Sequence, residues 1–185
     1  MLLLASKSPR RRELLKMLDI PFEIIEIKDV EENYPPELAK EKVPEFLSKL
    51  KADAYLEYLQ DEDILITADT VVIIDNEIIG KPASLKEAKE MLHKLSGKIH
   101  KVITGVTVTS IKKSVTFSTV TDVEFSHLSD DSINFYVDTY RPLDKAGAYG
   151  IQEWIGAIGV AGIKGSFYNV MGLPVHRLYH ELQLF

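Results

Sequence analysis

The feature that most constrains the fold is the apolar run ILITADTVVII, residues 64–74. A nearly continuous apolar run of this length, bounded by turn residues, is typical of a fully buried central strand. Asp75-Asn76 then predicts a turn into a short return strand over 77–79. The chain is therefore expected to contain a layered sheet with this run near its middle.

Shorter segments on either side alternate between strand and helix patterns. Ser8 is expected to cap a helix with Pro9 at its first position, and Pro44 to open another. Before the apolar run we expect a strand over 2–4, a strand over 22–27, a polar loop over 28–42, and a second helix whose inner face holds Phe46, Leu47, Leu50 and Ala54. The order of these segments favours an α/β protein.

The second half continues the alternation. Ser84 and Glu87 form a capping-box pattern, and Gly97 ends that helix. Two long strands are expected, over about 98–110 and 114–125, followed by helices after Ser129 and after Pro174. The fold class is α/β, with a mixed central sheet flanked by helices. No linker or repeat divides the chain, so residues 1–185 are expected to form a single domain.

Composition excludes several classes of protein. The net charge of −6 disfavours nonspecific binding to nucleic acid, and the absence of cysteine excludes a thiolate metal site. No window approaches the roughly 18 apolar residues of a membrane span. The first residues place a basic cluster after the apolar ones, unlike a signal peptide. We therefore expect a cytoplasmic protein without a membrane or nucleic-acid partner.

A dense basic cluster lies at the start of the first predicted helix. Arg10, Arg11 and Arg12 fill a first turn where Asp or Glu is normally favoured, and each costs roughly 0.3–1 kcal/mol there if nothing compensates. A phosphate on the exposed N–H groups would remove this cost, and arginine adds bidentate hydrogen bonds. The alternative is an exposed basic turn paired with Glu13 or with surface carboxylates.

Asp69 and Thr70 interrupt the apolar run. A buried carboxylate must be paired, hydrogen-bonded or bound to a metal, because its isolated charge is costly. Asp69 therefore suits a general base for water or a ligand for a divalent cation. The alternative is a structural aspartate held by backbone donors at a bulge.

Other candidate residues give weaker signals. Lys51 flanks a buried helical stripe and either reaches a cleft or extends to water, while Lys81, in GKP, either directs a charge or belongs to a plain turn. Glu31 and Glu32 suit Mg²⁺ binding or an acidic loop. The histidines do not form a metal-binding pattern: we expect His176 and His180 on the surface of a helix and a structural role for His100.

Six sequence blocks together resemble the Maf family of nucleotide pyrophosphatases. They are SKSPRRRELL, ADTVV, GKP, SGKIHKVITGV, DKAGAYGIQ and GSFYNVMGLP, and they occur in the family's order from Ala5 to Pro174. The resemblance implies hydrolysis of nucleoside triphosphates between the α- and β-phosphates. It also implies a divalent cation, Mg²⁺ or Mn²⁺, a homodimer, and a fold similar to that of the inosine triphosphate pyrophosphatases.

The resemblance also assigns roles to individual residues. Asp69 corresponds to the proton acceptor; Arg10, Thr70 and Gln152 correspond to residues tied to substrate choice; Glu32, Lys51 and Lys81 match further site positions. We expect Arg10 and Arg11 to bind the triphosphate at the first helix, and Asp69 and Glu32 to bind the metal. Whether Asp69 acts as base or as metal ligand stays open.

The block DKAGAYGIQ resembles the branch that acts on dTTP, UTP and modified pyrimidine nucleotides. The donor and acceptor of Gln152 suit the imide edge of thymine or uracil. Glu153 and Trp154 depart from the glycine that many relatives carry after this glutamine, and we expect them to reshape the base pocket. The alternatives are a 7-methyl-GTP pyrophosphatase, and a noncatalytic nucleotide sensor that regulates cell division.

Overall fold

The computed structural model describes residues 1–25 and 30–185. The parts of the predicted strand over 22–27 and of the predicted loop over 28–42 that fall on residues 26–29 lie outside the described residues. Among the helices of the described residues, none has the length and apolar composition that crossing a membrane requires.

The strands form one mixed sheet, as the sequence predicts. They are β1 (Leu2–Leu4), β2 (Glu23–Ile24), β3 (Ile64–Ile74), β4 (Glu77–Ile79), β5 (Ile99–Thr109), β6 (Ser114–Phe125) and β7 (Val160–Lys164). Their order is β2-β1-β3-β5-β6-β7, with β4 paired to β3. β1 runs parallel to β2 and β3, whereas the β3–β4 and β6–β7 pairs are antiparallel. The predicted central strand is therefore confirmed as β3.

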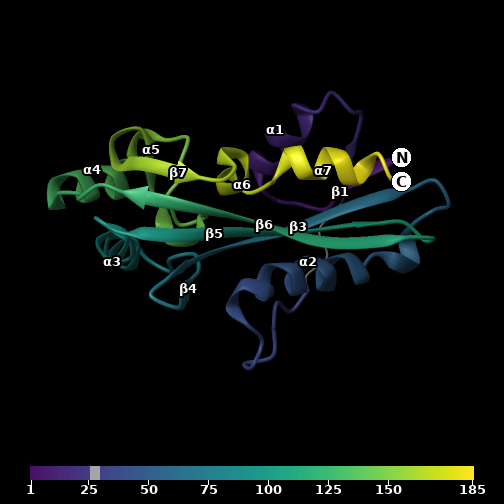
Figure 1. Ribbon diagram of the computed structural model, residues 1–185, viewed down its shortest axis with the longest axis horizontal. Coiled ribbons are helices and arrows are strands. Elements are labelled where there is room, and N and C mark those ends of the chain that lie inside the picture. The colour runs from purple at the N-terminus through teal and green to yellow at the C-terminus, as the bar shows by residue number, and fades with distance from the viewer. Residues whose placement is uncertain (26–29) are drawn as a thin grey trace. The chain divides into compact units, whose positions relative to one another are not determined.

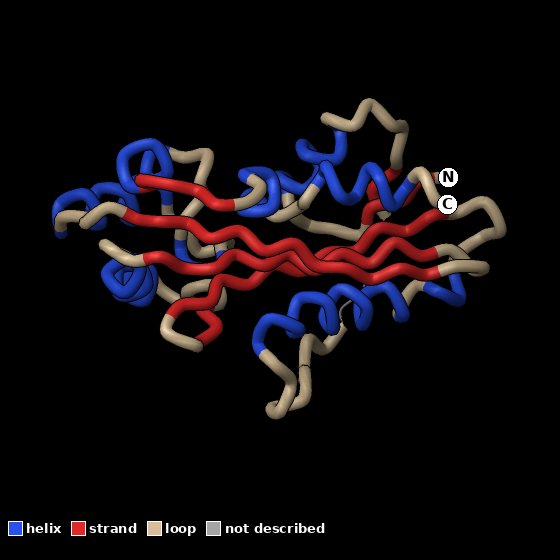
Figure 2. The backbone as a smooth tube through the Cα atoms, viewed as in Figure 1, coloured by secondary structure: helices blue, strands red, loops and turns tan. Residues whose placement is uncertain are grey.

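Helices alternate with these strands along the chain (Figure 2). They are α1 (Pro9–Lys16), α2 (Val43–Asp53), α3 (Leu85–Leu95), α4 (Asp130–Tyr140), α5 (Trp154–Gly159), α6 (Phe167–Met171) and α7 (Val175–Leu182), with 3₁₀ turns at Lys40–Lys42, Leu56–Tyr58 and Ala146–Ala148. The predicted caps are present: Ser8, Ser84 and Ser129 each accept a hydrogen bond from a backbone N–H of the first turn. These contacts fix where α1, α3 and α4 begin.

The chain divides into two compact units. The first unit contains Met1–Thr70, Thr104–Thr119 and Gly172–Phe185, and the second contains Val71–Ile103 and Val120–Met171. Strands β3, β5 and β6 contribute residues to both units.

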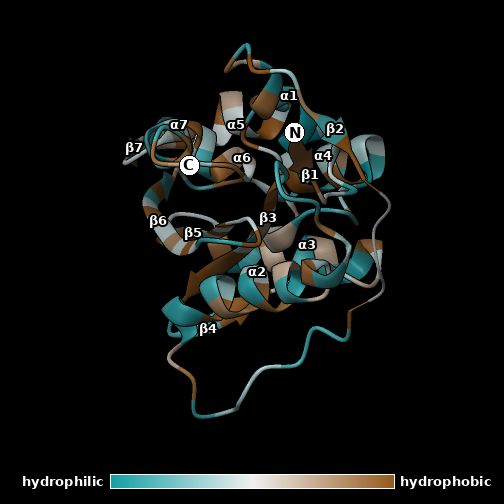
Figure 3. Cartoon of the chain, turned by 90° about the vertical axis from the view of Figure 1, so that its right-hand side faces the viewer, coloured by the Kyte–Doolittle hydropathy of each residue, from teal (hydrophilic) through white to brown (hydrophobic). Residues whose placement is uncertain are grey.

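In the first unit, helices cover both faces of the strands. α1 and α7 lie on one face and α2 on the other (Figure 1), and the apolar strands β1 and β3 lie between α1 and α2 (Figure 3). Gly105 on β5 permits the close packing of α2, because a Cβ there would lie 2.2 Å from the carbonyl carbon of Pro44. The start of α2 is thereby fixed against β5.

The inner face predicted for α2 is wrong at Phe46, which is 37% exposed. The buried face instead contains Val43, Leu47 and Ala52, together with the polar Ser48. Ser48 Oγ lies 3.0 Å from Thr107 Oγ1, so its hydroxyl is satisfied within the core. The apolar pattern misplaced this face because a buried serine does not register as a core residue.

The second unit has its own apolar core, which α3, α4 and α5 build with residues of β3–β6. Its buried residues are Val72, Ile74, Ile79, Ala88, Leu92, Leu95, Val102, Val123, Phe125, Leu128, Ile133, Tyr136, Val137, Ala148, Tyr149, Ile151 and Ile155. His100 is buried in this unit beside Tyr149, with His100 Nε2 2.6 Å from the tyrosine hydroxyl. Burial lowers the pKa of His100 to about 4, so the ring is neutral at physiological pH.

Candidate active site

The start of α1 carries the basic residues that the sequence singles out. The side chain of Ser8 accepts a hydrogen bond from Arg11 N at 3.4 Å, and the first turn contains no acidic residue. Arg12 donates to the carbonyl of Ser6 through Nε and Nη2, each at 3.4 Å. The positive end of the helix dipole and the side chain of Arg10 therefore lie in the same turn, an arrangement that favours a bound anion.

Arg11 joins three segments of the first unit. Its Nε donates to Gly172 O at 2.8 Å, its Nη1 to Ala68 O at 2.9 Å and its Nη2 to Thr70 Oγ1 at 3.0 Å. Burial lowers the pKa of Arg11, while the nearby charge of Asp69 raises it. Three of the five guanidinium N–H groups of Arg11 are therefore used within the protein, which leaves two for a phosphate.

Asp69 lies on β3 and pairs with a lysine of α2. Lys51 Nζ donates to Asp69 Oδ1 at 2.7 Å and also lies 3.1 Å from Glu32 Oε1. The side chains of Asp69 and Lys51 are 13% and 19% exposed, whereas that of Glu32 is 52% exposed. Two carboxylates from separate segments therefore converge on one ammonium group. The side chain of Lys51 is therefore one partner of the Asp69 carboxylate.

Thr70 faces the opposite side of β3 from Asp69, because successive strand side chains alternate between faces. Its hydroxyl accepts from Arg11 and lies 2.9 Å from Thr104 Oγ1. Asp69 is thus directed toward α2 and Thr70 toward α1. These two residues of the ADTVV block therefore lie on different faces of the sheet.

Lys81 and Gln152 belong to the second unit. Lys81 lies between β4 and α3, Gln152 lies in the turn before α5, and both side chains are exposed. Both are accessible to a ligand. Their substrate-binding roles stay predictions.

The donors present fit a divalent cation only in part. Asp69 and Glu32 offer hard carboxylate oxygens, which suit Mg²⁺. Within the described part of the chain, no group of three or more His, Cys, Asp or Glu side chains is placed to hold a metal ion. Mg²⁺ commonly completes its coordination with substrate phosphates and water, so a two-carboxylate site is sufficient when a triphosphate is bound.

Several contacts have no sequence signature. The carbonyls of Ala68 and Gly172 accept from Arg11, and Thr104 supports Thr70. A backbone carbonyl is present at every residue, so only the folded chain identifies these acceptors. The proximity of Thr104 to Thr70 likewise depends on the pairing of β5 with β3.

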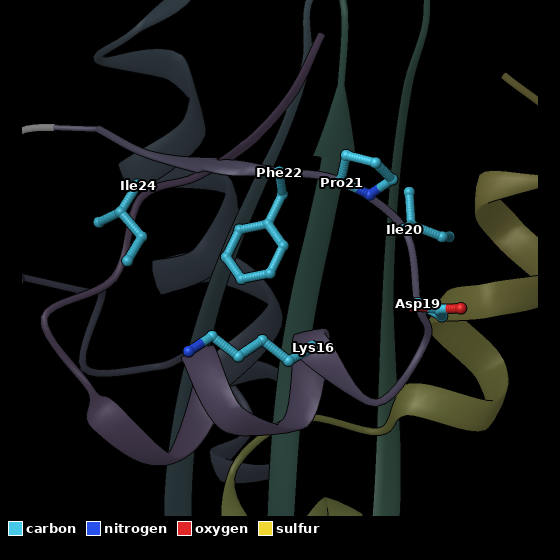
Figure 4. Close-up of a pocket in the computed structure, with 6 residues that line it drawn as sticks. All are labelled: Lys16, Asp19, Ile20, Pro21, Phe22 and Ile24. Carbon is cyan, nitrogen blue, oxygen red and sulfur yellow. The ribbon is translucent and has the colours of Figure 1, made fainter.

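A surface hollow lies elsewhere in the first unit, beyond the C-terminal end of α1 (Figure 4). It is lined by Lys16, Asp19, Ile20, Pro21, Phe22 and Ile24. None of these lining residues belongs to the set that the sequence singles out for chemistry.

Two known proteins are similar in sequence to this chain over nearly its full length. A protein from Porphyromonas gingivalis, named dTTP/UTP pyrophosphatase, is 54% identical over 186 aligned residues, covering 100% of this chain and 94% of that protein. A protein of the same name from Bacteroides thetaiotaomicron is 51% identical over 182 residues, covering 98% of this chain and 94% of its own length.

A solved structure supports the predicted fold. A HAM1 protein from Coxiella burnetii superposes with a TM-score of 0.53 at 15% sequence identity, covering 100% of this chain and 98% of that one. At that identity the likeness establishes the fold alone, a mixed sheet flanked by helices.

The family model described as "Maf-like protein" matches residues 1–185, the full length given. It therefore includes every block on which the resemblance rests, from the basic turn of α1 to the segment before α7. The chain belongs to the Maf-like protein family.

Proposed function

We propose that this chain hydrolyses dTTP and UTP to the nucleoside monophosphate and pyrophosphate. The observation that carries the proposal is the convergence of Asp69, Lys51 and Glu32 in a unit that also contains the basic start of α1. Pairs of carboxylates beside cations suit phosphoryl chemistry, in which positioning and charge supply most of the rate. The two relatives named dTTP/UTP pyrophosphatase support the choice of substrate.

The phosphates are proposed to bind at the start of α1. Arg10 supplies a cationic side chain, and the first-turn N–H groups supply backbone donors. Arg11 contributes mainly by holding Ala68 and Thr70 in place, because its guanidinium is already hydrogen-bonded to both. Lys51 and Lys81 add positive charge where negative charge grows in the transition state.

Asp69 is proposed to act on water. A water molecule adds to the α-phosphorus, the bond from the α-phosphorus to the bridging oxygen breaks, and pyrophosphate leaves. The carboxylate of Asp69 is the proton acceptor for the attacking water, while Lys51, which bonds its Oδ1 at 2.7 Å, fixes its orientation.

A divalent cation, Mg²⁺ or Mn²⁺, is proposed as the cofactor. When bound, it would polarise phosphate oxygens and neutralise their charge. Asp69 and Glu32 are the residues that would hold it.

We propose that Gln152 recognises the nucleobase. Its exposed amide offers a donor and an acceptor to the imide edge of uracil or thymine. A homodimer and a cytoplasmic location complete the proposal. Light scattering coupled to gel filtration tests the dimer: a mass of twice 20.9 kDa supports it, and a mass of 20.9 kDa contradicts it.

A panel of nucleoside triphosphates with Mg²⁺ tests the function. Release of pyrophosphate and monophosphate is measured for dTTP, UTP, CTP, ATP, GTP and 7-methyl-GTP. Preferred turnover of dTTP and UTP supports the proposal. Preferred turnover of 7-methyl-GTP identifies the sister activity, and binding without turnover identifies a sensor.

A further inference from the structure

Gln152 lies in a tight turn that begins at Gly150. Glu153 N donates to Gly150 O at 3.0 Å, so Ile151 and Gln152 are the two central residues of a β-turn. Ile151 is buried and 6% exposed, whereas Gln152 is exposed. One central residue thus fixes the turn in the core, and the other presents its amide to solvent.

The hydroxyl of Tyr136 on α4 contacts both ends of this turn. It accepts a hydrogen bond from Gly150 N at 3.0 Å and donates one to Glu153 Oε2. Burial, followed by the bond to Glu153, raises the pKa of Tyr136, so the hydroxyl stays protonated and able to donate. One oxygen atom therefore holds the first and last residues of the turn together.

A buried lysine completes the network. Lys145 Nζ lies 3.2 Å from Glu153 Oε1 and 2.8 Å from Asp144 Oδ1, and its side chain is 10% exposed. A Cβ at Gly150 would lie 2.9 Å from the carboxyl carbon of Glu153, so a larger residue there would displace this carboxylate. Both oxygens of Glu153 are thus occupied inside the protein.

Trp154, the residue after Glu153, makes a second contact with α4. The ring of Trp154, at the start of α5, packs edge-on against Phe135, with centroids 4.8 Å apart. Phe135 and Tyr136 are consecutive residues of α4, so the turn and the start of α5 are both attached to that helix. Glu153 and Trp154 therefore attach the turn to the interior of the second unit.

We propose that Tyr136, Glu153 and Lys145, here called the Tyr136 clamp, are positioning residues that set base specificity by fixing the turn that carries Gln152. The clamp touches no substrate; it acts through Gln152. The inference rests on the proposed function, because it takes Gln152 as the reader of the base. The donor and the acceptor of an amide discriminate between nucleobases only if their positions are fixed to within a fraction of an ångström.

The test compares UTP with CTP, which differ at the base edge. We measure kcat and KM for both nucleotides in the wild type, Tyr136→Phe and Glu153→Gln. Tyr140→Phe is the matched control, because it removes a hydroxyl from the same helix, and its ring stacks on Tyr136 at 5.0 Å. Thermal unfolding checks that each variant is folded. Amide hydrogen exchange of the peptide containing residues 147–156 measures the rigidity of the turn.

The clamp predicts a loss of selectivity rather than a loss of chemistry. In Tyr136→Phe the UTP-to-CTP ratio of kcat/KM falls about tenfold, mostly through a higher KM for UTP. The peptide exchanges faster, and Glu153→Gln, which retains one acceptor for the hydroxyl, gives a smaller change of the same kind. Tyr140→Phe keeps the wild-type ratio and exchange.

Four results would overturn the inference. An unchanged ratio in folded Tyr136→Phe and Glu153→Gln means that the clamp does not set specificity. An equal loss for both nucleotides assigns the clamp to stability alone. A wild type that hydrolyses UTP and CTP equally well overturns the specificity role but leaves the pyrophosphatase chemistry standing, whereas a wild type that hydrolyses no nucleotide overturns both proposals.

Discussion

Each unit of the molecule contains a lysine paired with a carboxylate, and the two pairs differ in what surrounds them. In the first unit, Lys51 lies 2.7 Å from Asp69 and also contacts Glu32, whose side chain is 52% exposed. In the second unit, Lys145 lies 3.2 Å from Glu153, whose other oxygen accepts from Tyr136. The first pair is therefore accessible to solvent beside Glu32, whereas the carboxylate of the second is covered by the buried Tyr136.

This difference supports the proposal that the first pair is reactive and the second structural. Two carboxylates around one ammonium keep a net negative charge, which favours the binding of a further cation. A carboxylate with both oxygens hydrogen-bonded inside the protein has no such exchange available without leaving a buried donor unpaired. We therefore assign chemistry to Asp69 and positioning to Glu153.

The largest expected effect follows from Asp69→Asn. Loss of the proton acceptor and metal ligand lowers turnover about a thousandfold, because general-base catalysis and cation binding are both impaired. Release of pyrophosphate measures the loss. Asp53→Asn is the control, since Asp53 forms an exposed ion pair with Lys49 on α2. Near-normal turnover by folded Asp69→Asn would remove this residue from the chemistry.

The buried ring of His100 predicts a pH effect on stability in the second unit. Its pKa falls from 6.5 to about 4 on folding, so between these values the unfolded chain binds more protons. The free energy of unfolding therefore decreases as pH falls through this window, by at most about 3 kcal/mol from this group. Urea unfolding of the wild type and His100→Phe at pH 7 and pH 4.5 measures the difference. An equally steep decrease in both proteins would exclude His100 as the cause.

Exchanging each lysine for methionine contrasts the two pairs directly. Lys51→Met is expected to lower turnover about a hundredfold, because charge stabilisation in the transition state is lost. Lys145→Met is expected to lower the free energy of unfolding by about 1–2 kcal/mol and to reduce the preference for UTP, with kcat little changed. Steady-state kinetics and urea unfolding are measured for both variants. The opposite pattern would reverse the assignment of the two pairs.

The smallest effect concerns Glu32. Its replacement by glutamine is expected to raise the Mg²⁺ concentration for half-maximal turnover about tenfold, because one ligand is weakened. Glu31→Gln is the matched control: its neighbouring carboxylate is also exposed but is not seen to contact Lys51 among the described residues. If both variants respond alike, neither glutamate is a specific ligand.

Much of the fold could be predicted because its signals are local. The apolar run of β3, the turn at Asp75-Asn76 and the serine caps each depend on a few adjacent residues. The sequence did not reveal α5, β7 and α6, which follow one another over residues 154–171. This segment is rich in glycine, and Gly156 packs so closely that a Cβ would lie 1.8 Å from Ile151 O. Tertiary contacts, which leave no periodic pattern, determine these elements.

The sequence indicates which residues belong to the candidate site, but it does not reveal the contacts that they make. The sequence singles out Asp69, Lys51 and Glu32, and the structure brings these three together. The sequence does not reveal that Arg11 donates to backbone carbonyls, because the choice of acceptor depends on which segments lie together in the folded chain. For Glu153 the sequence indicates a reshaped base pocket, whereas the structure directs this side chain to Tyr136 and Lys145.

The bond from Arg11 to Gly172 spans 161 positions of the chain. A ribosome releases the N-terminal helix long before it releases the acceptor for that arginine. Until residue 172 emerges, the guanidinium lacks one of its three protein partners. The arrangement around Thr70 is therefore completed only after residue 172 has emerged from the ribosome.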